Sequence, residues 1–158
     1  MLLALDIGNS NVSLGVFRGA ELRMRAKISV QTRRSADEYA AILYDLLRMR
    51  QISREEIGGC ILSSVVPGLT GLVEEAARTV TGTVPVRVGP GIRTGFPIRI
   101  DDPSQLGGDL VADTLAALTE YGAPLVLVDA GTVTTIAAVD GGRAYLGGCI
   151  VPGIRQGA

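Results

Sequence analysis

Apolar and polar positions in the first fifty residues predict three strands followed by a helix. Residues 2–7 form an apolar run typical of a buried strand, and two further segments, 12–17 and 21–30, are joined by a short glycine turn. Ser35 followed by Glu38 is a capping-box pattern, and the apolar spacing after it predicts an amphipathic helix to about residue 50. The chain is therefore expected to begin with antiparallel strands.

Strands and helices are expected to alternate after this point. The pattern predicts strands at 59–66, 84–88 and 125–129, and helices at 68–81 and 104–121. Hairpin strands followed by such crossovers favour an α/β class, with a mixed sheet of three antiparallel hairpin strands and flanking helices.

The opening pattern is repeated near the end of the chain. An apolar strand again ends in Asp-x-Gly, at Asp129, and is followed by strands at 133–139 and 144–150 around a Gly-Gly turn. The repeat predicts two similar domains, at residues 1–122 and 123–158, the second of them only begun. We therefore expect the chain to be part of a longer protein, and inactive on its own.

Composition limits the classes of partner and the types of catalytic residue that the chain could have. The chain has 158 residues, of which 47% are hydrophobic and 20% charged, with a net charge of -1. This balance predicts a globular domain and disfavours a nucleic-acid partner, which would need a basic surface. No histidine is present, so a general base would have to be a carboxylate, lysine, cysteine or tyrosine.

Cys60 and Cys149 lack metal-ligand spacing and are expected to be reduced. Neither a secretory signal nor a membrane span is recognised, so we expect a cytoplasmic enzyme.

Two Asp-x-Gly turns carry the candidate chemistry. Asp6-Ile-Gly8-Asn9-Ser10 and Asp129-Ala-Gly131-Thr132 each follow an apolar strand. Glycine lets a backbone approach phosphate closely, neighbouring amides and hydroxyls can donate to it, and an aspartate can hold Mg²⁺ through water. For either motif alone, an ordinary turn is the favoured interpretation. Their pairing after similar strands favours nucleotide binding.

A series of motifs resembles one family. In chain order these are Asp6-Ile-Gly-Asn-Ser-Asn11, Ser63-Ser-Val-Val-Pro67, Gly89-Pro-Gly-Ile-Arg-Thr-Gly95, Asp101-Asp-Pro103, Leu106-Gly-Gly-Asp109, Asp129-Ala-Gly-Thr132 and Gly147-Gly-Cys-Ile-Val-Pro-Gly153. Together they resemble the motifs of type III pantothenate kinase, within the superfamily of acetate and sugar kinases, heat-shock ATPases and actin. The resemblance implies an actin-like ATPase (ribonuclease H-like) fold and spans essentially the whole chain.

The resemblance also implies roles for individual residues. The first ATP phosphate loop would comprise Asp6, Ile7, Gly8, Asn9, Ser10, Asn11, Val12 and Ser13. Thr132 would contact ATP phosphates, and Asp129 would hold a monovalent cation, K⁺ or NH₄⁺. The pantothenate site would include Ile100, Gly107, Gly108, Asp109 and Leu110, with Asp109 as the general base.

Asp109 suits that role chemically, because a carboxylate near a helix N-terminus after two glycines can meet a substrate hydroxyl. In isolation, the same Gly-Gly-Asp could be merely a helix-terminal charge. The loop 89–95 with Arg93 is either beside the substrate or a plain connection, and both interpretations stay open.

Three positions depart from the family pattern. Ile100 and Leu110 stand where many members carry tyrosine and arginine, and Ala137 stands where an aspartate is common. The first two remove polar substrate contacts.

The resemblance implies ATP-dependent phosphorylation of pantothenate, the first step of coenzyme A biosynthesis, by a homodimer. One alternative is a non-catalytic nucleotide-binding accessory factor for transcription, which the lost polar contacts would suit. Another is an actin-like or heat-shock-like ATPase. The presence of Asp6, Asp109 and Asp129 argues against the accessory factor, and a base after two glycines has no evident purpose in an ATPase of the second kind.

Overall fold

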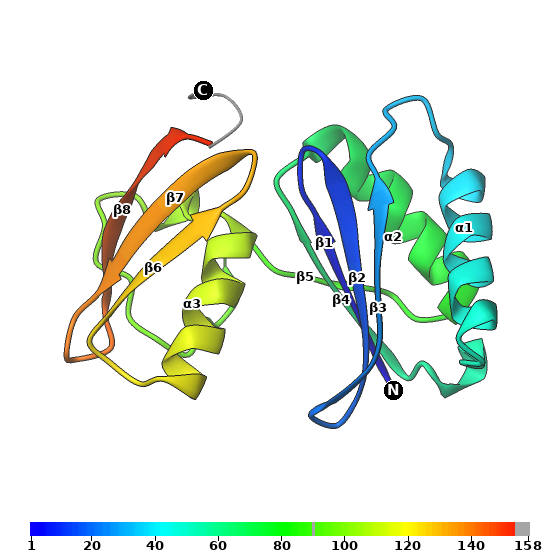
Figure 1. Ribbon diagram of the computed structural model, residues 1–158, viewed down its shortest axis with the longest axis horizontal. Helices are drawn as coiled ribbons and strands as arrows, with labels where there is room; N and C mark the ends of the chain where they lie inside the picture. Colours follow the sequence, from blue (N-terminus) through cyan, green and yellow to red (C-terminus); the bar gives the residue numbers. More distant parts are fainter. Residues whose placement is uncertain (90, 154–158) are drawn as a thin grey trace. The chain divides into compact units, whose positions relative to one another are not determined.

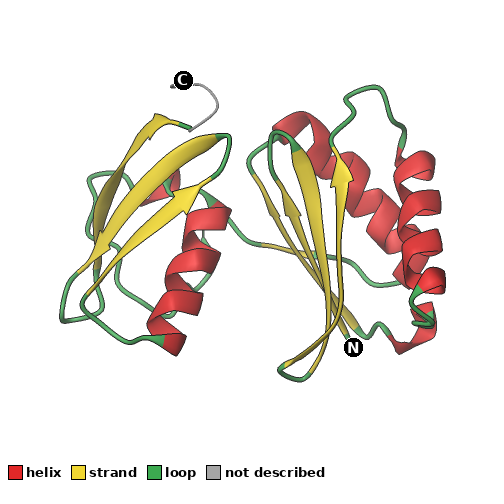
Figure 2. Ribbon diagram, in the orientation of Figure 1, coloured by secondary structure: helices red, strands yellow, loops and turns green. Residues whose placement is uncertain are grey.

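The computed structural model describes residues 1–89 and 91–153. The chain divides into two compact units, Met1–Val88 and Gly89–Ala158. Each unit combines strands and helices (Figures 1 and 2). None of the helices within the described ranges is long and apolar enough to cross a membrane.

The first unit is built on a five-stranded mixed sheet. Its strands are β1 (Leu2–Ile7), β2 (Asn11–Arg18), β3 (Glu21–Ser29), β4 (Gly59–Ser64) and β5 (Val86–Arg87), and they lie in the order β3-β2-β1-β4-β5. Strands β1, β2 and β3 pair antiparallel, whereas β4 pairs parallel to both β1 and β5.

Two helices cover one face of this sheet, α1 (Ala36–Met49) and α2 (Pro67–Thr81), as Figure 1 shows. Alternate residues of the strands point toward them, including Leu3, Ile7 and Val16, which are fully buried. Strand period two and helix period 3.6 thus place one apolar face of each element in a shared core.

Local signals set the helix ends in this unit. The capping box predicted at α1 is present: Ser35 Oγ accepts from the Glu38 amide, and the Glu38 carboxylate accepts from the Ser35 amide. Pro67 opens α2, where its missing N–H costs nothing, and Gly82 ends the helix in the left-handed conformation.

The second unit contains helix α3 (Gly108–Glu120) and a three-stranded antiparallel sheet, β6-β7-β8. The strands are β6 (Leu125–Ala130), β7 (Val133–Val139) and β8 (Tyr145–Pro152). The segment before α3 joins this unit through β8, because Tyr145 exchanges backbone hydrogen bonds with Pro97 and Arg99, each 2.8 Å long. Each unit therefore includes three consecutive antiparallel strands, as the sequence repeat predicts.

The α/β class and mixed sheet are confirmed, with two local corrections. The strand expected at 84–88 shortens to two residues, β5. The helix expected from about residue 104 begins later, because Asp102 caps a separate short 3₁₀ turn, Pro103–Gln105, and Gly107 is extended at the N-cap of α3. Both helices of the first unit lie on one face of its sheet (Figure 1).

The domain boundary expected after residue 122 differs from the division into compact units. Helix α3 belongs to the second compact unit, and it contacts β6. Compactness does not by itself define the extent of two repeated domains, so that boundary stays a prediction.

Candidate active site

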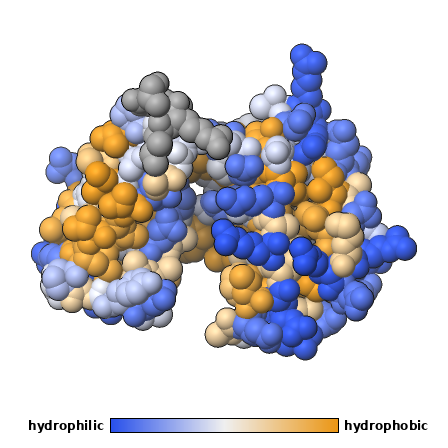
Figure 3. Space-filling model, viewed as in Figure 1, coloured by the Kyte–Doolittle hydropathy of each residue, from blue (hydrophilic) through white to orange (hydrophobic). Residues whose placement is uncertain are grey.

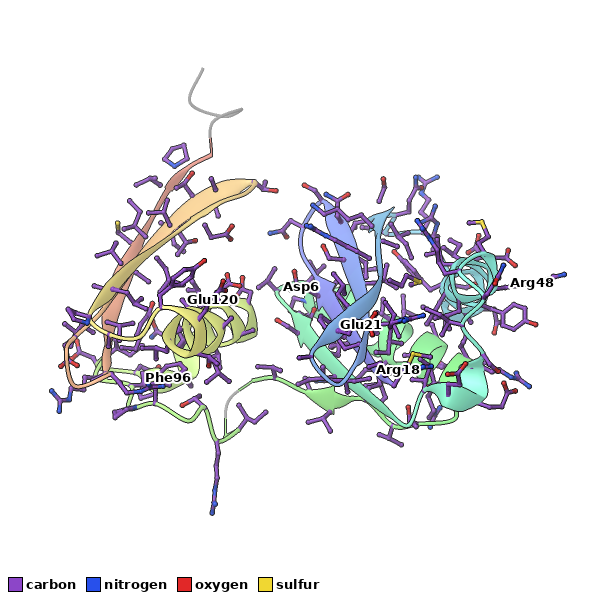
Figure 4. The ribbon with its side chains drawn as sticks, turned by 60° about the horizontal axis from the view of Figure 1, so that its bottom comes forward. Asp6, Arg18, Glu21, Arg48, Phe96 and Glu120 are labelled. Carbon is purple, nitrogen blue, oxygen red and sulfur yellow. The ribbon has the colours of Figure 1, made fainter. Side chains whose placement is uncertain are left out.

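The first candidate loop connects β1 to β2. The Gly8 amide donates to the Asn11 carbonyl over 2.9 Å, which closes a tight turn. Asp6 at the end of β1 pairs with Ser13 across the hairpin, and its side chain is exposed (Figure 4). The turn therefore presents a carboxylate and a hydroxyl on the same face of the sheet.

Side chains in this loop divide into two groups. Ile7 and Val12 are buried in the core of the first unit, at 0% and 1% exposure, so only their backbone groups could meet a ligand. Asn9, Ser10 and Asn11 are exposed. The turn thus exposes polar residues between two apolar residues that anchor it in the core.

The second candidate loop connects β6 to β7 and resembles the first in its hydrogen bonding and strand pairing. The Gly131 amide donates to the Val133 carbonyl over 2.9 Å, and Asp129 pairs with Thr135 across the hairpin. Asp129, Gly131 and Thr132 are exposed. Both loops thus place an aspartate opposite a hydroxyl residue and close the turn with a glycine amide.

Asp109 lies in the first turn of α3. Gly107 is extended at the N-cap, and no side chain caps this end of the helix. Asp109 is half-buried, and its Oδ1 accepts from the Leu110 amide over 2.8 Å. A carboxylate in this position is stabilised by the positive end of the helix dipole.

Tyr145 is a neighbour of Asp109 that the sequence analysis missed. It begins β8, is 3% exposed, and has a pKa raised by burial and by the negative charge of Asp109. The carboxylate therefore lies within electrostatic reach of a buried phenol in the same unit. A tyrosine inside an expected strand carries no sequence signal that distinguishes it from a packing residue.

The three departures from the family pattern lie in the second unit. Ile100 packs near Gly147, where a Cβ would meet Ile100 Cγ2 at 3.7 Å. Ala137 is 1% exposed, between Leu127 and Gly148 in the sheet, so an aspartate there would place a carboxylate in a buried position. Leu110 is half-buried next to Asp109.

The loop 89–95 contributes to a cavity of about 260 Å³ in the second unit. Phe96, which lies beside α3 in Figure 4, and Val111 from the first turns of that helix also line it. Thr94 Oγ1 donates to the Phe96 carbonyl over 2.7 Å, which shapes the loop. Arg93 is exposed and does not line the cavity. Whether this loop meets substrate stays open.

The Ser63-Ser64 motif has a structural role at its second residue. Ser64 Oγ accepts from the Val66 amide at the start of α2 and from Thr70 Oγ1. These two hydrogen bonds join the end of β4 to the first turn of α2.

The donors in both turns suit hard cations. Within residues 1–89 and 91–153, no cluster of three or more histidine, cysteine, aspartate or glutamate side chains could hold a metal. Mg²⁺ in kinases is usually held by one or two carboxylates together with water and substrate phosphates, so a single exposed aspartate such as Asp6 fits this mode. Asp129 is likewise an exposed carboxylate, in the second turn.

The predicted residues are thus distributed over both units. The first unit holds residues 6–13, and the second holds Asp129 and Thr132 in one turn, Asp109 beside Leu110 on α3, and Ile100 against β8.

The strand order β3-β2-β1-β4-β5 and the two glycine-closed turns are those of an actin-like ATPase fold. In agreement, the fold is similar to that of a solved protein from Porphyromonas gingivalis named a putative N-acetylglucosamine kinase. The TM-score is 0.52 at 14% identity, covering 94% of this chain and 47% of that one.

Sequence comparison defines the family. The family model described as type III pantothenate kinase matches residues 2–158, so the chain belongs to the type III pantothenate kinase family. It is 42% identical over 154 residues to a protein of that name from Moorella thermoacetica and 39% identical to one from Geobacter sulfurreducens. These alignments cover 98% of this chain but 61% and 60% of those relatives, so the chain spans about three fifths of their length.

Proposed function

We propose that the natural protein containing this chain transfers the γ-phosphate of ATP to the hydroxyl of pantothenate, the first step of coenzyme A biosynthesis. The observation that carries the proposal is the family match over residues 2–158, within which Asp109 stands at the N-terminus of α3. Relatives bearing the name of this kinase align along nearly the whole chain.

Asp109 acts in this proposal as the general base. Phosphoryl transfer depends mainly on positioning and charge neutralisation, so the base has only to orient the hydroxyl and accept its proton. Half-burial limits the water around the Asp109 carboxylate, and the glycines before it leave room for substrate. Gly107, Gly108, Ile100 and Leu110 form the substrate side, the last two through apolar contact.

The two turns hold the nucleotide. The amides and polar side chains at residues 6–13, together with Thr132, bind the phosphates of ATP. Asp6 holds Mg²⁺ through water, and Asp129 holds K⁺ or NH₄⁺. The bound Mg²⁺ supplies charge neutralisation on the transferred phosphate.

The protein works in the cytoplasm as a homodimer, with no nucleic acid or membrane as partner. The net charge of -1 supports the absence of nucleic acid. The accessory-factor alternative has no support among the relatives compared, which carry the name of the kinase.

The test is ADP release by the complete natural protein with pantothenate, Mg-ATP and potassium. Asp109→Asn should lower kcat by about a hundredfold or more, because removing a general base costs this much. Glu120→Gln, which removes a carboxylate at the far end of α3, is the matched control and should keep its turnover. ATP binding without pantothenate-dependent turnover in the parent protein would contradict the proposal and favour the accessory factor.

A further inference from the structure

The end of β8 lies directly against the Asp129–Thr132 turn. Gly153 follows β8 and is buried, although the turn itself is exposed. A Cβ at Gly153 would lie 2.7 Å from the Gly131 carbonyl oxygen and would overlap with that of Thr132. Side-chain carbons essentially never approach a neighbour within 3.0 Å, so this contact requires glycine.

The position of the Gly131 carbonyl at this contact determines the direction of the Thr132 amide. A peptide group is planar and trans, so its N–H points opposite to its C=O. The Gly131 carbonyl and the Thr132 amide belong to the same peptide group. Because that carbonyl lies against Gly153, the Thr132 amide points away from the end of β8. An amide held in this way is preorganised to donate to an anion.

A hydrogen bond within the turn supports the same geometry. The Gly131 amide donates to the Val133 carbonyl, so the turn is fixed from within as well as from β8. Proline restricts φ, and Pro152 therefore limits the directions in which the chain can enter Gly153. Pro152 also pairs with Val133, the first residue after the turn.

We propose that Gly153 is a positioning residue for nucleotide binding: the absence of its side chain lets the end of β8 hold the peptide group between Gly131 and Thr132 in the orientation that binds phosphate. This inference rests on the proposed role of the turn in ATP binding. Gly153 contacts no reacting group and acts through the turn.

The chain offers a matched control for simple loss of packing. A Cβ at Gly148 would overlap with the carbonyl oxygen of Ile136 in the middle of β7, an equally severe clash away from the turn. Gly141 has open space around it, so an alanine there introduces no clash. Gly148→Ala thus measures how a steric clash away from the turn changes the thermal midpoint and KM for ATP. Gly141→Ala measures how a glycine-to-alanine substitution without a clash changes them.

The experiment measures KM for ATP, KM for pantothenate and the thermal midpoint in the complete natural protein, and binding of a fluorescent ATP analogue at equilibrium. Gly153→Ala should raise KM for ATP and weaken analogue binding by about tenfold, which corresponds to one misdirected hydrogen bond to a charged group. KM for pantothenate should stay within about twofold. Gly148→Ala should lower the thermal midpoint by at least as much and leave KM for ATP within about threefold.

Other outcomes would overturn the inference. An unchanged KM for ATP in Gly153→Ala, or equal losses of ATP affinity in Gly153→Ala and Gly148→Ala, would show that Gly153 serves only packing. If Gly153→Ala does not fold, Pro152→Ala removes the proline ring, adds no side-chain bulk and frees the approach to Gly153. That variant should raise KM for ATP about threefold, and no change would overturn the inference.

Failure of the proposed function gives a different result. A parent protein with no pantothenate-dependent turnover would contradict the proposed kinase activity. Analogue binding by the parent, Gly153→Ala and Gly148→Ala would still decide the role of Gly153.

Discussion

At the scale of single residues, the two cysteines differ in accessibility. Cys60 in β4 is 3% exposed, and burial raises its pKa to about 11, whereas Cys149 in β8 is exposed. Because the thiolate is the reactive form, iodoacetamide at pH 8 should modify Cys149 in the folded 158-residue chain and leave Cys60 intact. Mass spectrometry of digested protein checks this, with unfolded protein as the control in which both react. Equal modification of both thiols in the folded chain would contradict the burial of Cys60.

Sequence could predict the residues of the two turns, because Asp-x-Gly after an apolar strand is a local pattern that recurs. The structure adds that Asp6 and Asp129 each pair with a hydroxyl residue across a hairpin. Sequence could not identify Tyr145 as a neighbour of Asp109, or Gly153 as a contact of the second turn, because both depend on how distant segments pack. The sequence of a glycine-rich motif does not show which neighbouring atoms leave no room for a side chain at a given glycine.

At the scale of elements, the contribution of the capping box at α1 to the free energy of unfolding can be measured directly. Ser35→Ala removes the side chain that accepts from the Glu38 amide, and should lower the free energy of unfolding by about 1 kcal/mol. Ser29→Ala is the control, since that residue is exposed in β3 and caps no helix, and should change stability by less than about 0.5 kcal/mol. Urea unfolding followed by circular dichroism measures both. Equal effects would mean that the cap contributes nothing to α1.

Element types were easier to predict than element ends. The start of α3 was placed too early, because Pro103 and Ser104 carry helix-start signals that serve a separate 3₁₀ turn. The correction places Asp109 in the first turn of α3, where its carboxylate accepts from the Leu110 amide. Strand β5 was predicted too long, because its apolar pattern continues where only Val86 and Arg87 pair with β4.

At the scale of the whole molecule, one face of the second sheet exposes apolar side chains. Val126 and Val128 of β6 are 67% and 64% exposed, and strand pairing places Ile136 and Cys149 on the same face. Figure 3 shows hydrophobic atoms over the strands of this sheet. Uncovered apolar surface of this kind favours association.

The 158-residue chain is therefore expected to self-associate at micromolar concentration and to show no pantothenate-dependent ADP release, since it spans about three fifths of the length of its named relatives. Replacing Val126 and Val128 together by lysine should shift sedimentation toward the monomer, because it places two charges on the apolar face. Val84→Lys alters a 76% exposed residue of the first unit and should leave association unchanged. A monomeric parent chain would contradict the role of this face, whereas full turnover by the 158-residue chain would show that the catalytic machinery lies entirely within it.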